Sequence, residues 1–512
     1  MNSFCMKTIK LLCILFLPAT ISAQYTYTET VAPLIYNKCS SCHHQGDIAP
    51  FALTNYKEVS EEADMIRTVI TKHTMPPWMP DTAYCHFLNE RSLTHTEIDQ
   101  ITSWISSGMP KGDAAAEPEL PEFPKSSALG KPDLVLSMQH SYLHKGNNAD
   151  EYRVFVLPTA LLQQHDVAAI EIRPGNPAIV HHIILGLDTT RFADKLDAKD
   201  PAYGYAQYAG FGFYPTYNNW SGWVPGNKTR FFPDGIGTNV FARSEVLLQM
   251  HYGPSPLDAA DSTVVNIYYS KKPVKRYLQS QLIGPNEIQD GPFFIPANKT
   301  KTFHAEYKVL EDISLISITP HMHWLGRKWE VYAINPRGDT THLIRINNWD
   351  FNWQNFFAFT HLVKIEKGSV IHAAATFDNT TSNEANPNAP PKNIKWGESA
   401  KDEMFLVYFA SIPYQTGDEK MDGAAAFNSF ELIAHSSASG KTELRFTLDG
   451  STTANLKLTD KDGKVIKQFF TAEHFEPGKQ VYPLDTHDLK PGAYWCKFTT
   501  SSFTASRKLV IP

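Results

Sequence analysis

The sequence predicts a multidomain protein with one small α-helical domain followed by three β-sandwiches. Its 512 residues exceed the size of an ordinary domain, and a hydrophobic fraction of 42% allows each domain to bury a core. Helical spacing of apolar residues is confined to the N-terminal part, whereas short alternating stretches broken by Gly, Pro and Asn fill the remainder. We therefore expect a helical domain, two antiparallel β-sandwiches of the jelly-roll type, and a small C-terminal β-sandwich.

The expected boundaries follow changes in composition along the chain. A Pro-rich stretch with little apolar pattern separates the helical domain from the first sandwich and is typical of a linker. The expected segments are 1–23 (signal peptide), 24–112 (helical domain), 113–132 (linker), 133–285 and 286–415 (the two larger sandwiches) and 430–512 (the C-terminal sandwich).

The first residues have the pattern of a secretory signal peptide. Lys7 and Lys10 precede the apolar run LLCILFLPA, and small residues follow before Gln24. Cys13 lies in this run without the small residues of a lipoprotein cleavage site, so we expect no lipid anchor. No later segment reaches the roughly 18 to 20 apolar residues that cross a bilayer, which predicts an exported protein without a transmembrane segment.

Charge and cysteine content exclude two further classes of protein. The net charge of −6 is mild and there is no basic run, so we expect no nucleic-acid partner. Of six cysteines, Cys5 and Cys13 would leave with the signal peptide, while Cys85 and Cys496 lie in different expected domains. A disulfide framework is therefore not expected.

The helical domain contains the pattern of c-type haem attachment. Residues 39 to 43 read CSSCH, in which Cys39 and Cys42 would add to the haem vinyl groups and His43 would ligate the iron. An oxidised Cys39–Cys42 pair and a zinc half-site are the alternatives that this spacing leaves open.

A well-marked helix is predicted near the end of the same domain. Thr94 and Glu97 form a capping box, and Gly108 ends the helix. Its apolar face comprises Ile98, Ile101, Trp104 and Ile105.

Together with the segments APFALTNY and TKHTMPPW, these features resemble a small cytochrome c domain. The resemblance implies one covalently bound c-type haem with His43 as the proximal ligand. It implies Met75 as the distal ligand, with Met79 as the competing candidate. An iron with His and Met ligands has no open position for a substrate, so the implied chemistry is one-electron transfer.

The two larger sandwiches carry histidines in strand-like segments. Two histidines two apart share one face of a strand, as His321 and His323 would, whereas adjacent His181 and His182 would face opposite ways. For the adjacent pair to share an ion requires a bulge, a strand end or different ring nitrogens. Each of these residues taken alone is more often an ordinary strand or core residue. The segments are AIVHHIILGL (His181, His182), LLQMHYG (His251), PHMHWLGR (His321, His323) and KDEMFLVYF (Met404).

In this order the segments resemble the copper type II ascorbate-dependent monooxygenases, the family of the peptidylglycine α-hydroxylating enzyme and dopamine β-monooxygenase. The passage SGWVPGNKTRFFPDGIGTNVFARSEVLLQMHYG is also similar, and the resemblance covers about residues 170 to 415. It implies two copper ions, and ascorbate or another one-electron reductant. The implied ligands are His181, His182 and His251 for an electron-transfer copper, and His321, His323 and Met404 for the catalytic copper that binds oxygen.

The family chemistry implied is hydroxylation of an activated C–H bond with O₂. A thioether such as Met404 suits a copper that passes through Cu(I) and offers little to zinc. Gln249 would share a face with His251 and support it from outside the ligand set.

Three positions expected to contact substrate depart in part from the peptide-amidating members. Those members have an arginine where Thr319 stands here and an asparagine where Leu406 stands, while their tyrosine is kept as Tyr408. The carboxylate clamp is thus incomplete, which argues against peptidylglycine and leaves another small molecule or peptide as the substrate. The aromatic run 205–220 either lines the substrate cleft or forms a packed loop.

The haem domain is expected to relay electrons to the coppers, and the competing hypothesis is that it docks to a separate redox partner. The alternative for the whole chain is a non-catalytic exported protein that binds copper or transfers electrons. A zinc-loaded structural protein is a third possibility, which Met404 as a ligand disfavours.

From about residue 430 the chain shows plain strand alternation with an Asp-Gly hairpin turn and the segment GAYWCKFTT. This part resembles the C-terminal sorting domain of the type IX secretion system of Bacteroidetes. The resemblance implies recognition by secretion machinery and export to the cell surface, periplasm or medium. A carbohydrate-binding or spacer sandwich is the alternative.

Overall fold

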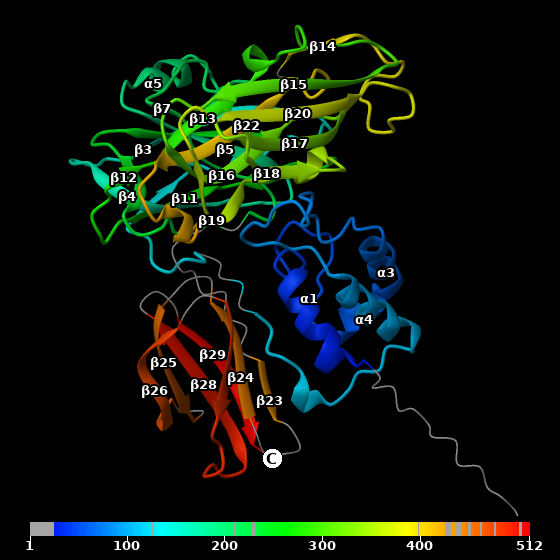
Figure 1. The fold of residues 1–512 in the computed structure, drawn as a ribbon, viewed down its shortest axis with the longest axis vertical. Coiled ribbons are helices and arrows are strands. Elements are labelled where there is room, and N and C mark those ends of the chain that lie inside the picture. The colour runs from blue at the N-terminus through cyan, green and yellow to red at the C-terminus, as the bar shows by residue number, and fades with distance from the viewer. Residues whose placement is uncertain are drawn as a thin grey trace, which may run out of the picture.

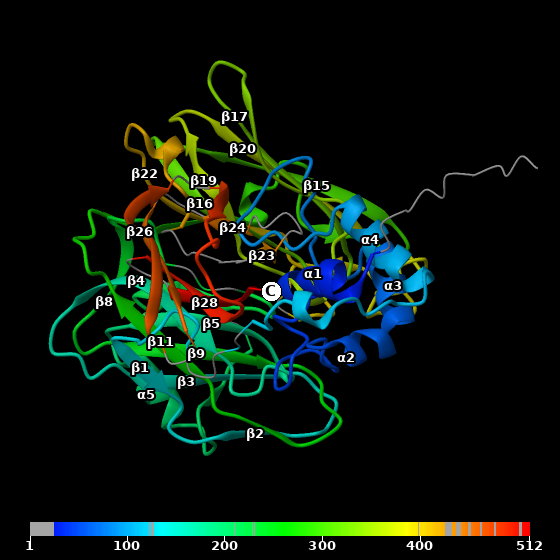
Figure 2. The ribbon, with the colours of Figure 1, turned by 90° about the horizontal axis from the view of Figure 1, so that it is seen from below.

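The computed structural model describes residues 25–121, 123, 127–208, 210–227, 229, 231–397, 399–424, 433–436, 442–448, 452–460, 463–475, 478–500 and 504–511. The expected signal peptide, 1–23, lies outside these residues. In the described part the protein is mostly β-sheet with few helices, and the N-terminal helices gather on one side of the molecule, whereas α5 (Phe192–Asp197) lies among the strands (Figures 1 and 2). A search of the described helices finds none with the length and apolarity needed to cross a membrane.

The N-terminal helical unit has its own apolar core. The predicted capping box is confirmed, because Thr94 accepts a hydrogen bond from the Glu97 backbone N–H while the Glu97 carboxylate accepts from that of Thr94. The last helix buries Ile101, Trp104 and Ile105. Gly108 follows it with φ +89°, a left-handed conformation that glycine adopts without strain. The elements are η1 (Tyr27–Val31), α1 (Ala32–Lys38), α2 (Tyr56–Glu61), α3 (Ala63–Thr71), α4 (His95–Ser106) and η2 (Ala114–Ala116).

Two five-stranded sheets, whose inner faces share one apolar core, form the first β-sandwich. One sheet has the order β1 (Leu134–Ser137), β11 (Val264–Tyr269), β4 (His165–Arg173), β8 (Ile236–Val240), β12 (Arg276–Tyr277). The other has the order β6 (Tyr205–Ala206), β3 (Glu151–Pro158), β9 (Glu245–Tyr252), β5 (Val180–Asp188), β7 (Tyr217–Trp223). The remaining elements are the pair β2 (Tyr142–His144) and β10 (Ala259–Asp261), and α5 (Phe192–Asp197).

Two four-stranded sheets form the second sandwich around the largest apolar core of the described residues. They have the orders β13 (Gln279–Ile283), β22 (Leu406–Pro413), β16 (Ile313–His321), β19 (Phe357–Ile365) and β15 (Thr300–Lys308), β20 (Val370–Asp378), β17 (Gly326–Ile334), β18 (Thr340–Ile346). The remaining elements are the pair β14 (Phe294–Ile295) and β21 (Ile394–Lys395), and the 3₁₀ turns η3 (Pro285–Glu287), η4 (Phe351–Trp353) and η5 (Asp418–Lys420).

The expected boundary at 285 is displaced. β13 lies before that boundary yet pairs along its length with β22 of the second sandwich, so the first sandwich ends before Gln279. Apolar side chains of the two sandwiches also pack together: Ile236 of the first sandwich packs with Ile316 and Ile412 of the second. The sheets of the two sandwiches are therefore in direct contact.

The C-terminal sandwich contains two further sheets around a separate core. The predicted hairpin is confirmed, since β25 and β26 pair antiparallel and Gly463 has φ +82° in the connecting turn. The sheets have the orders β23 (Ile433–Ser436), β24 (Thr442–Leu448), β27 (Gly478–Leu484) and β26 (Val465–Phe475), β25 (Thr452–Thr459), β28 (Gly492–Thr500), β29 (Thr504–Ile511).

A segment of the helical unit, residues 76–91 between α3 and α4, is built into the second sandwich, and we call it the N-terminal arm (Figure 1). Phe87 forms a β-bridge with Phe359 of β19, and the Leu88 N–H donates to the Ala358 carbonyl at 2.8 Å. The Phe87 side chain is only 3% exposed and belongs to the core of the second sandwich. The helical unit is therefore joined to this sandwich by shared core packing.

Polar contacts hold the same arm. The Asp81 carboxylate accepts hydrogen bonds from Arg345 Nε at 3.0 Å and from its terminal nitrogen at 2.8 Å, and a third from Asn347 at 3.0 Å. The Arg345 hydrogen bonds lower the pKa of Asp81. Met79 Sδ accepts the Asp350 N–H at 3.1 Å.

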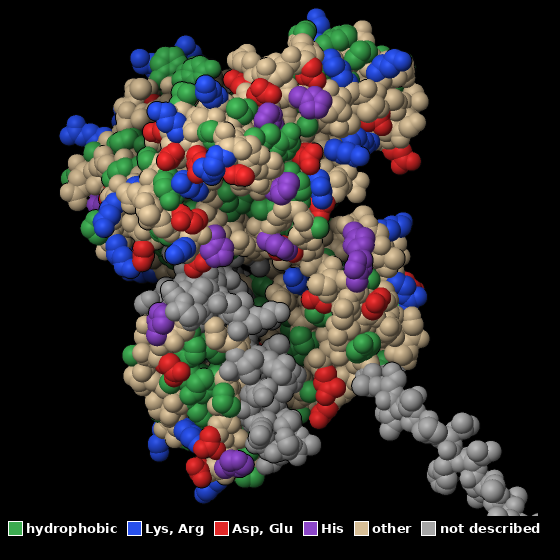
Figure 3. Space-filling view, in the orientation of Figure 1, with side chains coloured by type: hydrophobic (Ala, Val, Ile, Leu, Met, Phe, Trp, Pro, Cys, Tyr) green, Lys and Arg blue, Asp and Glu red, His purple; other side chains and the backbone are tan. Residues whose placement is uncertain are grey.

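Charged side chains of both signs are mixed on one face of the molecule (Figure 3). On the face shown in Figure 3, the Lys and Arg side chains alternate with Asp and Glu. This distribution agrees with the mild net charge of −6.

The arm yields a stability prediction. Phe87→Ala should destabilise the second sandwich by about 3–5 kcal/mol, because it removes a buried ring from that core. Differential scanning calorimetry measures the shift, with Phe192→Ala, which is 41% exposed in wild type, as the matched control. An unchanged transition for the second sandwich in Phe87→Ala would contradict the shared core.

Candidate metal centres

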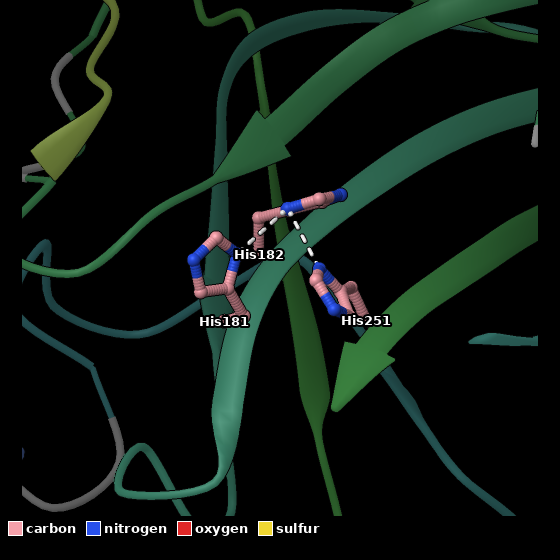
Figure 4. A group of neighbouring side chains, drawn as sticks. All are labelled: His181, His182 and His251. Atoms are coloured by element: carbon pink, nitrogen blue, oxygen red, sulfur yellow. Dashed lines mark hydrogen bonds between the residues drawn. The ribbon is translucent and has the colours of Figure 1, made fainter. Parts of the chain in front are cut away.

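The two neighbouring strands β5 and β9 bring three histidines together (Figure 4). His182 pairs directly with His251, while the register shifts between Val180 and His182. His181 is thus the extra residue of a β-bulge, which turns its side chain toward the side of His182. Of the three arrangements that would let the adjacent histidines share an ion, the structure has the bulge.

The geometry of this cluster fits one metal ion. His182 Nδ1 lies 3.2 Å from His181 Nδ1 and 3.4 Å from His251 Nδ1. Metal–imidazole bonds are about 2.0–2.1 Å long, so two nitrogens on one ion lie roughly 3.3–3.6 Å apart. Among the described residues, this is the only group of three or more His, Cys, Asp or Glu side chains close enough to hold an ion.

Burial keeps these imidazoles neutral, as metal ligands must be. Burial lowers the pKa of all three side chains: to about 3 for His181, well below the usual value for His182, and below the usual value for His251. The nitrogens that converge therefore offer lone pairs at neutral pH.

The sequence analysis missed Asp150, which precedes β3 and orients His251. Its Oδ1 lies 2.7 Å from His251 Nε2, so that nitrogen donates to the carboxylate and Nδ1 remains for a metal. The hydrogen bond from His251 lowers the pKa of Asp150. On the other side Tyr152 stacks on the His251 ring at 4.1 Å.

Gln249 lies where the alternation of β9 places it, and it contacts the loop of the aromatic run. It alternates with the core residues Leu248 and Met250, so it shares the face of His251. Its Nε2 donates to the Gly210 carbonyl at 2.8 Å. Phe211 of this run is buried and Tyr214 is 91% exposed, so the run contains packed and exposed rings.

A second pair of histidines lies at the end of β16. The strand ends at His321, and His323 lies in the turn that follows, so strand alternation does not align this pair. The turn nevertheless brings the two rings within 5.2 Å of each other. Met404 is 5% exposed and lies two residues before the first residue of the neighbouring strand β22, Leu406, which pairs with His321.

Both histidines have Nδ1 engaged, which leaves Nε2 for a metal. His321 Nδ1 is hydrogen-bonded to Gln354 Oε1, and His323 Nδ1 lies 3.2 Å from the Asp402 carbonyl. Burial lowers the pKa of His321, and it lowers that of His323 to about 3. Two neutral imidazoles beside a buried thioether form a donor set suited to copper.

The carboxylate of Glu403 ties the two ligand-bearing segments together. It accepts the backbone N–H groups of His323 at 2.8 Å, Leu325 at 2.6 Å and Met404 at 3.2 Å. Glu403 is fully buried, and burial raises its pKa to about 8. Nothing in the sequence around Glu403 indicated this contact.

The three positions expected to contact substrate share one sheet face with His321. Thr319 pairs with Tyr408 and His321 pairs with Leu406, so all four side chains project from the same side of the β16–β22 pair. The alternate residues, among them Ile318 and Phe409, belong to the core on the opposite side.

The two histidine clusters face each other across the contact between the sandwiches. Burial is the main cause of the lowered pKa of His182, and the charges of His321 and His323 lower it further. The charge of His251 likewise adds to the effect of burial on the pKa of His323. The two clusters lie close together, because the ring of Phe351 lies 5.5 Å from that of His181 and 5.5 Å from that of His323.

The residues of the CSSCH segment suit covalent haem. No disulfide joins Cys39 and Cys42 in the described part of the structure. The backbone turns tightly here, with the His43 N–H donating to the Cys39 carbonyl at 3.0 Å. His43 Nδ1 lies 3.1 Å from the Phe51 carbonyl, which leaves Nε2 for iron.

The contacts of Met79 favour Met75 as the second haem ligand. Met79 packs against the core of the second sandwich and accepts the Asp350 N–H, so its thioether is engaged outside the helical unit. Met75 follows α3 and is partly buried. Within the linker, Phe123 stacks on His44 at 3.8 Å.

Asp150→Asn should weaken metal binding at the three-histidine cluster by about 10- to 100-fold, because it removes the charge that orients and polarises His251. Competition against a chromophoric copper chelator measures this affinity. Asp258→Asn is the matched control, since Asp258 of the same sandwich pairs only with surface groups such as Lys145. Equal affinities in the two variants would contradict a role for Asp150.

Glu403→Ala should lower the free energy of unfolding by about 3 kcal/mol or more, since three backbone N–H groups lose their buried acceptor. Glu403→Gln, which keeps one acceptor oxygen, should lose less. Urea unfolding measures both against Glu366→Ala, a more exposed glutamate of the same sandwich that pairs with Arg337. If Glu403→Ala lowered the free energy of unfolding no more than Glu366→Ala does, Glu403 would not hold the two ligand-bearing segments together.

Comparison with solved structures finds likenesses with low TM-scores. They include the infectious bursal disease virus VP2 subviral particle, with 12% identity over 58% of this chain and 76% of that chain and a TM-score of 0.16. A Ruminococcus gnavus β-glucuronidase in complex with N1-substituted uronic isofagomine has 10% identity over 46% of each chain and a TM-score of 0.16. The Dictyoglomus thermophilum β-D-glucuronidase has 11% identity over 45% of this chain and 43% of that chain, with a TM-score of 0.13. The chain spans less than half the length of these two glucuronidases, and no curated protein matches it.

Two family models match separate parts of the chain. Residues 295–430 match "Copper type II ascorbate-dependent monooxygenase, C-terminal domain", a range that includes His321, His323 and Met404. Residues 438–512 match "Secretion system C-terminal sorting domain", which confirms the predicted sorting domain and indicates export of the Bacteroidetes type. The chain therefore carries the C-terminal domain of the copper type II ascorbate-dependent monooxygenase family, together with a C-terminal sorting domain of a secretion system.

Proposed function

We propose that this exported protein is a copper-dependent monooxygenase that hydroxylates an activated C–H bond with O₂. The observation that carries the proposal is the pairing of two buried histidine clusters. One has three converging Nδ1 atoms, and the other lies in the domain that matches the monooxygenase family.

His181, His182 and His251 would hold one copper, and His321, His323 and Met404 the other. Bound copper supplies one-electron redox chemistry at both centres and activation of O₂ at the second. The protein supplies neutral ligands by burying the imidazoles, and it sets their orientation through Asp150 and Gln354. Keeping both sets of ligands at the contact between the sandwiches limits the access of water.

The substrate would bind beside His321 on the face that carries Thr319, Leu406 and Tyr408. This face offers two hydroxyl groups and an apolar side chain but no cation among these residues. A substrate without a carboxylate therefore suits this face better than a peptide that ends in glycine. The substrate is a small molecule or peptide with an activated C–H bond.

The helical unit would carry one c-type haem on Cys39 and Cys42, with His43 and Met75 as iron ligands. Haem supplies reversible one-electron transfer when bound. We propose that the unit passes electrons to the copper centres, supplementing ascorbate or another one-electron reductant. The arm supports this, because its packing into the second sandwich keeps the helical unit beside the metal centres. Docking of the helical unit to a separate redox partner is the competing role.

Metal analysis with EPR tests the copper assignment, using protein matured in a host that attaches c-type haem. We expect about two coppers per haem and type 2 Cu(II) signals without magnetic coupling, which ascorbate bleaches and air restores with oxygen uptake. Met404→Ala should keep the three-histidine copper and lose oxygen uptake. Zinc at both sites, or no effect of Met404→Ala, would overturn the assignment.

A substrate screen then separates the enzyme from a non-catalytic copper protein, for which no compound stimulates oxygen use. Cys42→Ala tests the relay, because it should disturb haem attachment and slow turnover with a protein reductant. Unchanged turnover with every reductant would refute the relay and leave the copper assignment standing.

A further inference from the structure

A short turn of the second sandwich, residues 350–356 between β18 and β19, contacts both histidine clusters and the N-terminal arm, and we call it the junction turn. It contains the 3₁₀ turn η4, which begins where the Asp350 side chain accepts the Asn352 N–H at 2.9 Å. An Asp cap of this kind fixes the backbone that follows it.

The ring of Phe351 stands between the two histidine clusters. Its centroid lies 5.5 Å from that of His181 and 5.5 Å from that of His323. These two imidazoles are therefore separated by no more than twice that distance. Phe351 is 8% exposed and packs against Trp324 at 4.8 Å, so an apolar ring occupies this space.

The same turn is hydrogen-bonded to His321 and to the N-terminal arm. Gln354 Nε2 donates to the Phe351 carbonyl at 3.0 Å while its Oε1 is hydrogen-bonded to His321. The Asp350 N–H donates to Met79 Sδ of the N-terminal arm at 3.1 Å. One turn thus contacts the arm, the His321 side of one centre and, through Phe351, both clusters.

We propose that Phe351 is the bridging residue across which electrons pass between the two metal centres, an inference that rests on the proposed function. One ring is in contact with a candidate ligand of each centre, so Phe351 provides a path of packed side chains from His181 to His323. In each transfer Phe351 would conduct one electron, so that the metal held by His181 is oxidised by one unit and the metal held by His323 is reduced by one. No bond breaks and no proton moves at Phe351, and ascorbate or another one-electron reductant restores the donor.

Phe356 of the same turn provides a matched control. It is also a phenylalanine and packs over Gly222 of β7, where a Cβ atom on Gly222 would lie 2.7 Å from the Phe356 ring. No ring contact between Phe356 and a histidine occurs among the described residues. Phe356→Leu therefore perturbs the turn and the contact between the sandwiches without removing the bridge.

The test is freeze-quench EPR on the copper-loaded full chain after mixing with one electron equivalent of ascorbate. In wild type and in Phe356→Leu, the two Cu(II) signals should decay together. In Phe351→Leu, resting signals and copper content should be unchanged, while the signal of the His321–His323 centre should decay about tenfold more slowly, within the range usual for coupling residues. Phe351→Tyr, which restores an aromatic ring, should recover the wild-type rate.

Three outcomes are decisive. Equal decay in Phe351→Leu and wild type would overturn the bridge and leave the proposed function intact. Equal slowing in Phe351→Leu and Phe356→Leu would also overturn it, because the effect would then belong to the turn as a whole. Binding of fewer than two coppers by wild type would overturn the proposed function, and the bridge with it.

Discussion

The pairing of β5 with β9, with its bulge at His181, is the constraint on which the three-histidine cluster depends. A regular strand would send His181 and His182 to opposite faces. One extra residue in β5 rotates His181 so that its Nδ1 lies 3.2 Å from that of His182. The partner strand then places His251 beside them, and the centre needs no mobile loop to assemble it.

Buried hydrogen bonds set the orientation of these ligands. Asp150 engages Nε2 of His251, whereas Gln354 and the Asp402 carbonyl engage Nδ1 of His321 and His323. The two centres therefore present different ring nitrogens, Nδ1 in the first and Nε2 in the second. Glu403 adds a fixed link between the turn that carries His323 and the segment that carries Met404.

The helical unit is coupled to the sandwiches by packing as well as by its linker. Phe87 completes the core of the second sandwich, and two nitrogens of Arg345 donate to one carboxylate oxygen of Asp81. A unit held in this way has a fixed position relative to the metal centres. An electron-transfer role for it would then require no docking step, in contrast to an exchange between separate proteins.

The sequence by itself determined the ligand types and the local structure. The CSSCH segment, the four histidine and methionine segments, the capping box of α4 and the Asp-Gly hairpin are all short-range patterns, and they were readable because spacing within one element fixes them. The family matches cover only some of these segments: 295–430 includes His321, His323 and Met404, and 438–512 includes the Asp-Gly hairpin.

Only the tertiary structure decided how these segments meet. Asp150 lies 101 residues from His251, Glu403 80 residues from His323, and Met79 271 residues from Asp350. No local pattern encodes contacts at such separations, because they arise when the sheets pack and backbone donors seek buried acceptors. The bulge at His181, the transfer of β13 to the second sandwich and the place of Phe351 between the clusters have the same origin. Each depends on which strands pair and in what register, and several pairings are compatible with one hydrophobic pattern.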